Sequence, residues 1–310
     1  MSFFFYCPWH DKNDWLVKIK RRFKNNRILT LRDNPNFLKI KYAIIWDLPD
    51  KIYKKLTNVK LLFSMGAGVD HILNLPSYNQ VPIVRLRDKL MAQRMSNHVI
   101  SQILHYQLKL NMYKENQKNH RWIDFIEPLP NEDLQVGILG TGFLGSCVGK
   151  TLFELGYKVQ GYKNSKPNKK YVFPVFYKKQ DLKKIIIDSN ILVSILPSTP
   201  KTNNFINKDL LQLMQKKALL INVGRGSVTN EYDLINHLRK NKSFYASLDV
   251  FKEEPLPKKH IFWRLPNVIV TPHIASLTGI NSAVEYMYKK YKEFRINKDF
   301  RSDVDLNKGY

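Results

Sequence analysis

Short apolar runs recur along the first third of the chain and predict strands separated by helical stretches. The runs at 3–6, 43–46 and 61–64 have strand length, and residues 13–23 mix apolar and basic positions at helical spacing. Strands that alternate with helical segments are typical of a parallel, doubly wound sheet. The first part of the chain is therefore expected to form an α/β unit.

The same alternation is clearer in the second part of the chain. Strands are expected at 136–139, 157–162, 190–196, 218–223, 245–250 and 268–270, and helices at 148–155, 207–215 and 230–240. Between the two parts, residues 94–112 read as a long helix with a wide apolar face, and 113–133 as an irregular excursion. This pair indicates either an interdomain or subunit contact, or an ordinary core helix with a long loop.

Length and composition agree with two globular domains. The chain has 310 residues, 44% of them hydrophobic, and no apolar run approaches the roughly 18 residues of a membrane span. The apolar start lacks a basic segment and soon meets Asp11, so it reads as a first strand rather than a signal peptide. Cys7 and Cys147 give no disulfide framework. These features favour a cytoplasmic enzyme without a membrane partner.

The net charge of +25, from 51 basic and 26 acidic residues, can mark a polyanion-binding surface. The lysines are scattered, however, and no zinc-finger spacing or RNA-binding motif accompanies them. A compositional bias is the preferred interpretation, so no nucleic-acid partner is expected. A functional basic surface remains the alternative.

A glycine-rich turn follows the strand at 136–139. Gly140, Gly142 and Gly145 form G-x-G-x-x-G between a strand and a helix, the context of a dinucleotide-binding turn. Gly140 would allow the tight turn, Gly142 the approach of a pyrophosphate, and Gly145 close helix–strand packing. The helix N-terminus would then attract the phosphates. The pattern predicts a nucleotide site.

The strand at 157–162 indicates which cofactor is preferred. An NAD site usually places an acid after this strand, but here Lys163 and Lys166 follow it. Nine lysines and one aspartate lie between Tyr157 and Lys184. This pattern predicts a site for a 2′-phosphate and hence NADPH in preference to NADH. The alternative is the general lysine excess.

Arg225, Glu254 and His273 each come just after a predicted strand of this second part. Since the carboxyl ends of parallel strands gather at one edge of a sheet, these side chains are expected to converge. Two glycines, Gly66 and Gly68, follow the strand at 61–64 and leave backbone N–H groups that could hold an anion. A plain turn is an equal alternative there.

Together these motifs resemble those of the D-isomer-specific 2-hydroxyacid dehydrogenase family. The resemblance extends over nearly the whole chain and is carried by Gly66–Asp70, Gly140–Gly145, Leu196–Pro200, Asn222–Gly226, Asp249–Pro257 and Thr271–His273. It implies two doubly wound, Rossmann-like domains, with the cofactor domain (99–285) inserted in a substrate domain (1–98, completed by 286–310). It also implies a homodimer formed through 94–133.

The resemblance assigns roles to individual residues. His273 would be the proton donor, Glu254 its partner and Arg225 the substrate anchor. The expected substrate contacts further include Trp46, Gly66, Ala67 and Gly68. Besides the fingerprint glycines and the two lysines, the expected cofactor contacts are Phe143, Leu144, Pro197, Val223 and Asp249. No metal is expected.

The activity implied is NADPH-dependent reduction of small 2-oxo acids, glyoxylate to glycolate and hydroxypyruvate to D-glycerate. Histidine can carry a proton near neutral pH, and arginine offers a planar fork that suits a carboxylate. Alternatives are a dehydrogenase acting on D-lactate or 3-phosphoglycerate, and a dinucleotide-sensing regulator of the same fold. Asp47 and the segment Ser96–His98 depart from the family's usual residues, which leaves the substrate's identity open.

Overall fold

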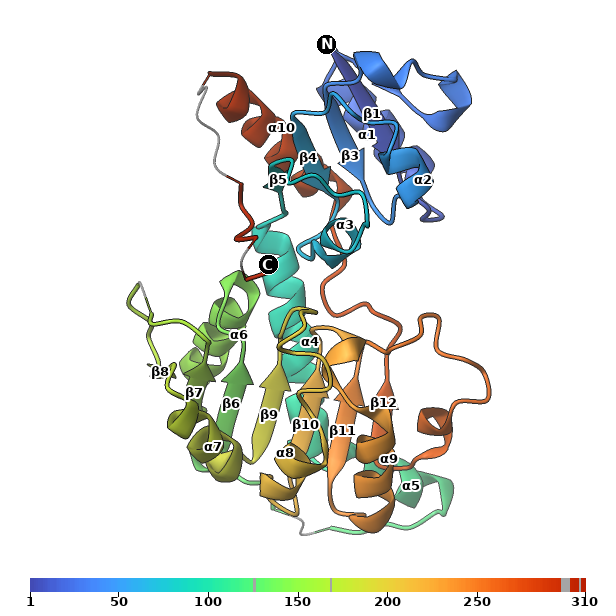
Figure 1. The fold of residues 1–310 in the computed structure, drawn as a ribbon. Coiled ribbons are helices and arrows are strands. Elements are labelled where there is room, and N and C mark those ends of the chain that lie inside the picture. The colour runs from blue at the N-terminus through green and yellow to red at the C-terminus, as the bar shows by residue number, and fades with distance from the viewer. Residues whose placement is uncertain (125–126, 168, 297–301, 307) are drawn as a thin grey trace. The chain divides into compact units, whose positions relative to one another are not determined.

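The computed structural model describes residues 1–124, 127–167, 169–296, 302–306 and 308–310 (Figure 1). The chain divides into two compact units, one made of Met1–Met91 with Thr278–Tyr310 and the other of Ala92–Leu277. The second unit is thus inserted into the first. The expected boundaries at 98/99 and 285/286 fall inside helices α4 and α10, whereas the second observed boundary precedes α10.

The first unit is a five-stranded parallel sheet in the order β2-β1-β3-β4-β5. Its strands are β1 Ser2–Tyr6, β2 Arg27–Leu29, β3 Tyr42–Ile45, β4 Leu61–Ser64 and β5 Ile83–Val84. Its helices are α1 Lys12–Arg22, α2 Asp50–Tyr53, α3 Asp70–Leu73 and α10 Ile280–Ile296. The C-terminal helix returns to this unit, as the expected organisation requires.

Aromatic side chains hold α10 against the sheet and α1. The ring centroids of Phe23, after α1, and Tyr288 lie 5.0 Å apart, and those of Tyr42 and Tyr291 lie 5.1 Å apart. Edge-to-face rings at this spacing add to the gain from burying their area. Since the chain returns to the first unit at Thr278, before α10 begins, the whole helix belongs to that unit.

The second unit is a seven-stranded parallel sheet in the order β12-β11-β10-β9-β6-β7-β8. Its strands are β6 Gln135–Leu139, β7 Lys158–Tyr162, β8 Val175–Phe176, β9 Ile191–Ser194, β10 Leu219–Asn222, β11 Tyr245–Leu248 and β12 Val268–Val270. Its helices are α4 Lys89–Gln107, which begins in the first unit, α5 Leu110–Lys118, α6 Phe143–Glu154, α7 Lys179–Asp188, α8 Lys208–Leu213 and α9 Glu231–Lys240. The predicted class, two doubly wound parallel sheets, is confirmed.

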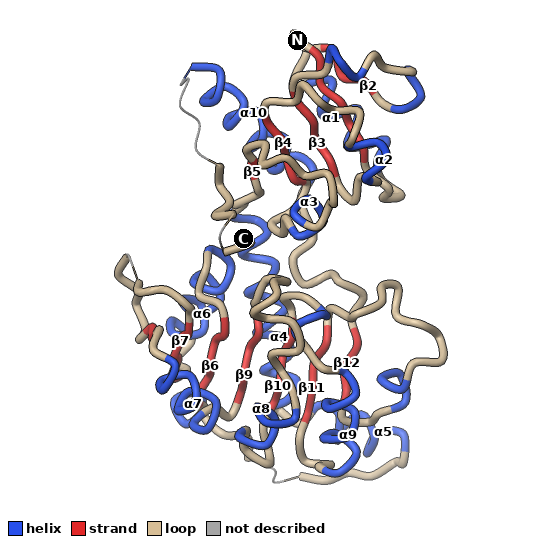
Figure 2. Tube along the Cα trace, in the orientation of Figure 1, coloured by secondary structure: helices blue, strands red, loops and turns tan. Residues whose placement is uncertain are grey.

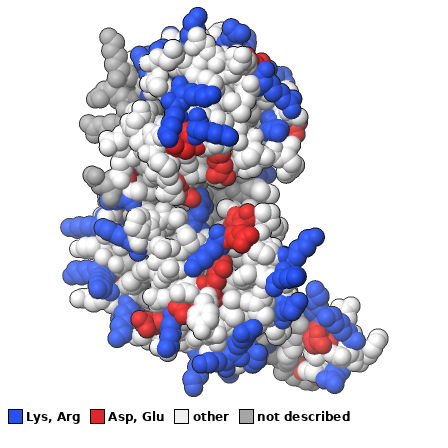
Figure 3. Space-filling view, turned by 45° about the vertical axis from the view of Figure 1, so that its right-hand side comes forward, with Lys and Arg blue, Asp and Glu red and all other residues white. Residues whose placement is uncertain are grey.

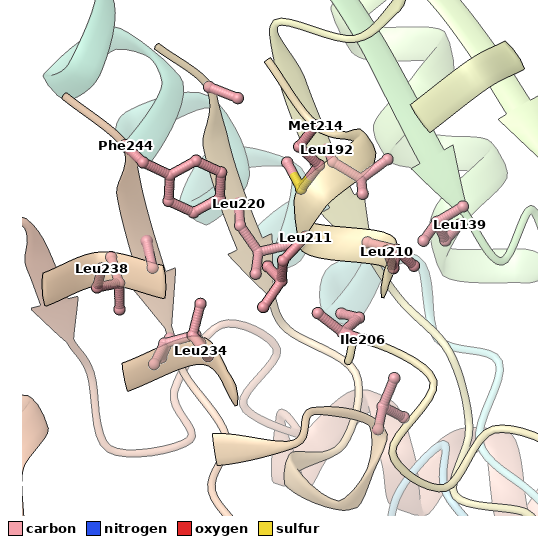
Figure 4. Close-up of a cluster of buried hydrophobic side chains, with 14 of the residues drawn as sticks. Leu139, Leu192, Ile206, Leu210, Leu211, Met214, Leu220, Leu234, Leu238 and Phe244 are labelled. Carbon is pink, nitrogen blue, oxygen red and sulfur yellow. The ribbon is translucent and has the colours of Figure 1, made fainter. Parts of the chain in front are cut away.

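Both faces of this second sheet are buried, as expected for parallel strands with continuous apolar runs. On one face, the cluster in Figure 4 joins the sheet to α7, α8 and α9 through residues such as Ile185, Leu211 and Leu234. On the other face, Val99 of α4 and Val148 of α6 pack on the sheet. The strand ends are thereby fixed in position.

Some elements differ from the sequence-based expectation. The helix expected at 94–112 is instead α4 and α5, because Lys109 between them has a φ of 54°, which an α-helix does not allow. Helix α7 and the short strands β2, β5 and β8 were not expected. Residues 125–126, within the expected excursion, lie outside the described residues.

Among the described residues, no helix is long and apolar enough to cross a membrane.

Candidate active site

The glycine-rich turn lies where the order of strands in the second sheet reverses. β6 is bordered by β7 on one side and β9 on the other, and open α/β sheets bind ligands at such a point. Gly140 has a φ of 98°, and a Cβ there would lie 2.8 Å from the carbonyl oxygen of Ile195. Only glycine meets both conditions without strain.

The other two glycines differ in what surrounds them. A Cβ on Gly145 would lie 2.0 Å from the Gly140 carbonyl oxygen, so helix and turn pack too closely for any side chain. A Cβ on Gly142 would meet no described heavy atom within 4 Å. Gly142 also precedes α6, whose first N–H groups are free of helical partners. This open backbone beside a helix N-terminus fits a pyrophosphate.

Basic side chains follow β7, one strand away from the fingerprint turn. Lys163 comes directly after the strand, and its amide donates to the Phe176 carbonyl at 3.0 Å. Lys166 is exposed three residues further on. Lys169, which the sequence did not single out, lies with Nζ 3.3 Å from Ser146 Oγ on α6. Lys169 therefore lies beside the fingerprint helix, and its positive charge suits a phosphate.

The remaining predicted cofactor contacts lie at strand ends of the same sheet. Phe143 and Leu144 open α6, Pro197 follows β9, and Val223 is buried directly after β10. The Pro197 carbonyl accepts a hydrogen bond from Thr202 Oγ1 at 2.6 Å, which fixes the loop after β9. All four come from the edge of the sheet that carries the glycines.

A buried asparagine shapes the turn that presents Arg225 after β10. Asn222 Nδ2 donates to the Arg225 carbonyl at 3.1 Å, and its Oδ1 accepts from the Gly224 amide at 3.1 Å. A Cβ on Gly226 would lie 1.9 Å from the carbonyl carbon of Phe251, so this turn packs directly on the segment after β11. The Arg225 turn and the Glu254 loop are thereby held together.

Glu254 and His273 form a hydrogen-bonded pair. His273 Nδ1 lies 2.7 Å from Glu254 Oε2, and Glu254 Oε1 accepts from the Phe251 amide at 2.9 Å. Burial alone would raise the pKa of Glu254, but these two hydrogen bonds and the charges of His273 and Arg225 hold it below its ordinary value. Glu254 is thus kept as a carboxylate beside the imidazole.

Asp249, which directly follows β11, organises the segment that carries His273. Its Oδ1 accepts from Thr271 Oγ1 at 2.6 Å and from the Ile274 amide at 2.9 Å, while Oδ2 accepts from the Ala275 amide at 2.9 Å. The His273 amide donates to the Asp249 carbonyl at 2.8 Å. These bonds hold His273 at a φ of 54°, unusual for a residue with a side chain.

His98 on α4 is a further polar group close to Asp249. Burial lowers its pKa, although the negative charge of Asp249 opposes this shift. Its Nε2 is buried and has no hydrogen-bond partner among the described residues. A buried, unpaired ring nitrogen fits a site that is completed by a bound group.

The predicted substrate residues of the first unit lie together after β3 and β4. Trp46 directly follows β3, and the segment Gly66–Gly68 begins two residues after β4. A Cβ on Gly66 would lie 2.6 Å from Trp46 Cζ3, so the six-membered ring of the indole packs directly against this glycine. Within the described residues, no cluster of His, Cys, Asp or Glu could hold a metal ion.

In the second unit, the structure therefore brings Arg225, Glu254 and His273 together at the carboxyl ends of β10, β11 and β12, where loops leave the strands (Figure 2). Sequence reasoning identified these three but missed the residues that support them. Asn222 and Thr271 lay inside the quoted motifs, and a polar residue directly at the end of an apolar strand is the signal that could have identified them.

Comparison with known proteins now defines the class of this protein. Residues 100–275 match the model of the D-isomer specific 2-hydroxyacid dehydrogenase NAD binding domain. The chain belongs to this family, which confirms the resemblance and the enzyme class, an oxidoreductase.

Similar proteins within this family include reductases and structures solved with NADPH or NADP. The chain is 32% identical over 316 residues to glyoxylate/hydroxypyruvate reductase A of Photorhabdus laumondii, covering 100% of both chains. A family member from Xanthobacter autotrophicus Py2, solved with NADPH and MES, has a TM-score of 0.92 at 28% identity, covering 100% of this chain and 99% of that one. The NADPH-dependent glyoxylate/hydroxypyruvate reductase of Sinorhizobium meliloti, solved with NADP and sulfate, has a TM-score of 0.91 at 29% identity with the same coverage.

Proposed function

We propose that this protein uses NADPH to reduce glyoxylate to glycolate and hydroxypyruvate to D-glycerate. The observation that carries this proposal is the paired His273 and Glu254 beside Arg225, on a sheet that also bears the dinucleotide fingerprint. The full-length similarity to reductases that are named for these two substrates supports it.

The roles of the side chains follow from their bonds. Bound NADPH would supply the hydride that is added to the carbonyl carbon of the substrate. Because Glu254 engages Nδ1 of His273, the Nε2 atom is left to donate a proton to the carbonyl oxygen. Arg225 would bind the substrate carboxylate and stabilise negative charge as it develops on that oxygen.

The choice of NADPH rests on charge around the fingerprint. Lys163 and Lys166 follow β7 where an NAD enzyme usually has an acid, and Lys169 reaches α6. Two of the similar structures were solved with NADPH or NADP. The cationic segment would attract the 2′-phosphate that NADH lacks.

We further propose that the protein works as a homodimer in the cytoplasm. Side chains along α4, α5 and the loop after them leave apolar area exposed, namely Leu104, Leu108, Leu110, Tyr113 and Trp122. Trp122 is 94% exposed, which is costly for so large an apolar group unless a partner covers it. The free thiols of Cys7 and Cys147 suit a reducing compartment.

Sedimentation velocity tests the dimer. The wild type should sediment as a dimer, and Trp122→Glu should shift it toward the monomer, because burying an unpaired charge in an interface is unfavourable. Tyr232→Glu, at another exposed aromatic on α9, is the matched control and should stay dimeric. A monomeric wild type, or a dimer unaffected by Trp122→Glu, would count against this interface.

The activity is tested by following nicotinamide absorbance with a panel of 2-oxo acids and both cofactors. Glyoxylate and hydroxypyruvate with NADPH should give the highest kcat/KM. A preference for pyruvate would favour the D-lactate alternative. Absence of turnover combined with salt-sensitive DNA binding would favour the regulator.

A further inference from the structure

Ser64, the last residue of β4, fixes the shape of the segment Gly66–Gly68 in the first unit. Its side chain is fully buried, and its Oγ donates to the Gly68 carbonyl at 2.8 Å. Ser64 Oγ also accepts a long hydrogen bond from the Gly66 amide, at 3.4 Å. A single hydroxyl therefore connects both ends of the loop whose N–H groups are proposed to hold the substrate carboxylate.

His71, in the first turn of α3, connects this hydroxyl to a second loop. Its Nε2 lies 3.1 Å from Ser64 Oγ, and its Nδ1 accepts from the Asp47 amide at 3.2 Å. Since Nδ1 accepts a hydrogen bond, it carries no proton, and the proton of a neutral ring must lie on Nε2. His71 then donates to Ser64 Oγ, which leaves the Ser64 proton for Gly68. The donors and acceptors form one consistent chain.

The turn held by His71 is a strained one. Asp47 has a φ of 44°, a left-handed conformation that residues with side chains seldom adopt. Such backbone persists when its surroundings fix it. The bond from the Asp47 amide to His71 is one such constraint, and it lies one residue after Trp46.

The imidazole of His71 also supports the indole of Trp46. The two ring centroids are 4.2 Å apart at an interplanar angle of 40°. The other edge of the indole lies against Gly66, where an added Cβ would be 2.6 Å from Trp46 Cζ3. His71 thus contacts Ser64, the Asp47 turn and Trp46, and through them the glycine loop.

From this arrangement we infer that His71 and Ser64 are positioning residues for substrate binding. They hold the N–H groups of Gly66–Gly68 and the face of Trp46 in the geometry that receives the carboxylate end of a small 2-oxo acid. The inference rests on the proposed function, since it names the residues that shape the expected substrate loop. Neither residue was identified from the sequence.

Steady-state kinetics with two variants test this inference. His71→Phe keeps a ring against Trp46 but loses both hydrogen bonds, and Ser64→Ala removes the shared hydroxyl. Each should raise the KM for glyoxylate and the inhibition constant of oxalate about tenfold, as expected for lost hydrogen bonds. The kcat should change less than threefold, and the dissociation constant of NADPH should not change. His10→Phe, at an exposed histidine of the same unit, is the control.

The double variant shows whether the two substitutions disturb one shared chain of hydrogen bonds or cause two independent defects in substrate binding. If both residues act through one chain of hydrogen bonds, His71→Phe with Ser64→Ala should be hardly worse than the worse single variant. The inference would be overturned if the double variant raised KM by the product of the two single-variant increases. It would also be overturned if KM were unchanged in both single variants.

Hydrogen exchange followed by mass spectrometry provides a readout that needs no activity. Peptides covering residues 64–72 should exchange faster in His71→Phe than in the wild type or His10→Phe, since the loop loses a constraint. If the wild type reduces no 2-oxo acid while this exchange still rises, the proposed function fails and the role of His71 in shaping the loop stands. If activity is present but neither exchange nor KM moves, the positioning role is wrong.

Discussion

At the residue scale, the proposed chemistry depends on keeping Glu254 as a carboxylate beside His273. Glu254 is only partly withdrawn from water, with its side chain 36% exposed, yet its hydrogen bonds hold its pKa below the ordinary value. The pair with His273 therefore persists into mildly acidic solution. The 44% exposed His273 side chain keeps a route for substrate and proton exchange.

Glu254→Gln tests this electrostatic role. Glutamine keeps the shape of the side chain but removes the carboxylate that His273 Nδ1 contacts, so kcat/KM for reduction should fall about tenfold or more. Steady-state kinetics with glyoxylate measure this effect, and an unchanged kcat/KM would contradict the assignment of Glu254 as the partner of His273.

The same substitution has a signed effect on stability. Because the folded pKa of Glu254 is lowered, the unfolded chain binds more protons in acid, and the stabilising contribution is present above about pH 4.5 and lost as pH falls further. The difference in free energy of unfolding between wild type and Glu254→Gln should therefore shrink from pH 6 to pH 3.5 in urea titrations. A difference that grows toward acid would have the wrong sign.

At the scale of elements, parallel strands turn distant residues into neighbours. β10, β11 and β12 are adjacent in the sheet, so the segments that follow them carry Arg225, Glu254 and His273 to one edge.

Within the fingerprint, β6 and α6 are joined by glycines with different surroundings. Packing thus requires Gly145, whereas the space beside Gly142 is open.

A pair of glycine variants distinguishes these two requirements. Gly145→Ala places a methyl group 2.0 Å from the Gly140 oxygen, which should lower stability by about 1–3 kcal/mol through overpacking. Gly142→Ala meets no described atom, so the melting temperature should hold while NADPH binding weakens about tenfold. Calorimetry and fluorescence titration measure the two quantities. Equal effects of both variants on stability would contradict this distinction.

The sequence predicts elements best where a strong apolar run ends in a distinctive turn. Strands β4 and β12 were placed residue for residue, since Leu61–Ser64 and Val268–Val270 are such runs. The break at Lys109 has no glycine or proline to mark it, and α7 lies in a lysine-rich stretch that obscures its apolar face. The chain of bonds through His71 arises from tertiary contacts between β3, β4 and α3, which no local pattern reports.

At the scale of the whole molecule, the lysines and arginines that give the charge of +25 are spread along the sequence. Lys and Arg side chains occur over both units on the face drawn in Figure 3, with acidic side chains between them. A dispersed excess agrees better with a compositional bias than with a dedicated polyanion surface. The segment after β7 is a local concentration of lysines, and we propose that it binds the 2′-phosphate of NADPH.

Lys163→Asp tests that purpose. Charge-assisted contacts of partly exposed lysines should give the wild type a preference for NADPH over NADH of about ten- to a few hundredfold in kcat/KM. The preference should decrease with rising salt. Lys163→Asp should shift it toward NADH, while Lys158→Asp, at the opposite end of β7, should not. A wild type that prefers NADH at low salt would show that these lysines belong to the general lysine excess and do not form a 2′-phosphate site.

We propose that the whole molecule works as a reductase in which His273 of the second unit donates the proton. The most direct measurement compares product formation from hydroxypyruvate by wild type and His273→Ala under saturating NADPH. The wild type should form one D-glycerate for each NADPH oxidised, and the variant should bind NADPH normally while kcat falls by about 10²–10⁴-fold. A variant that retains near-wild-type turnover, or a wild type that forms no D-glycerate, would contradict the claim.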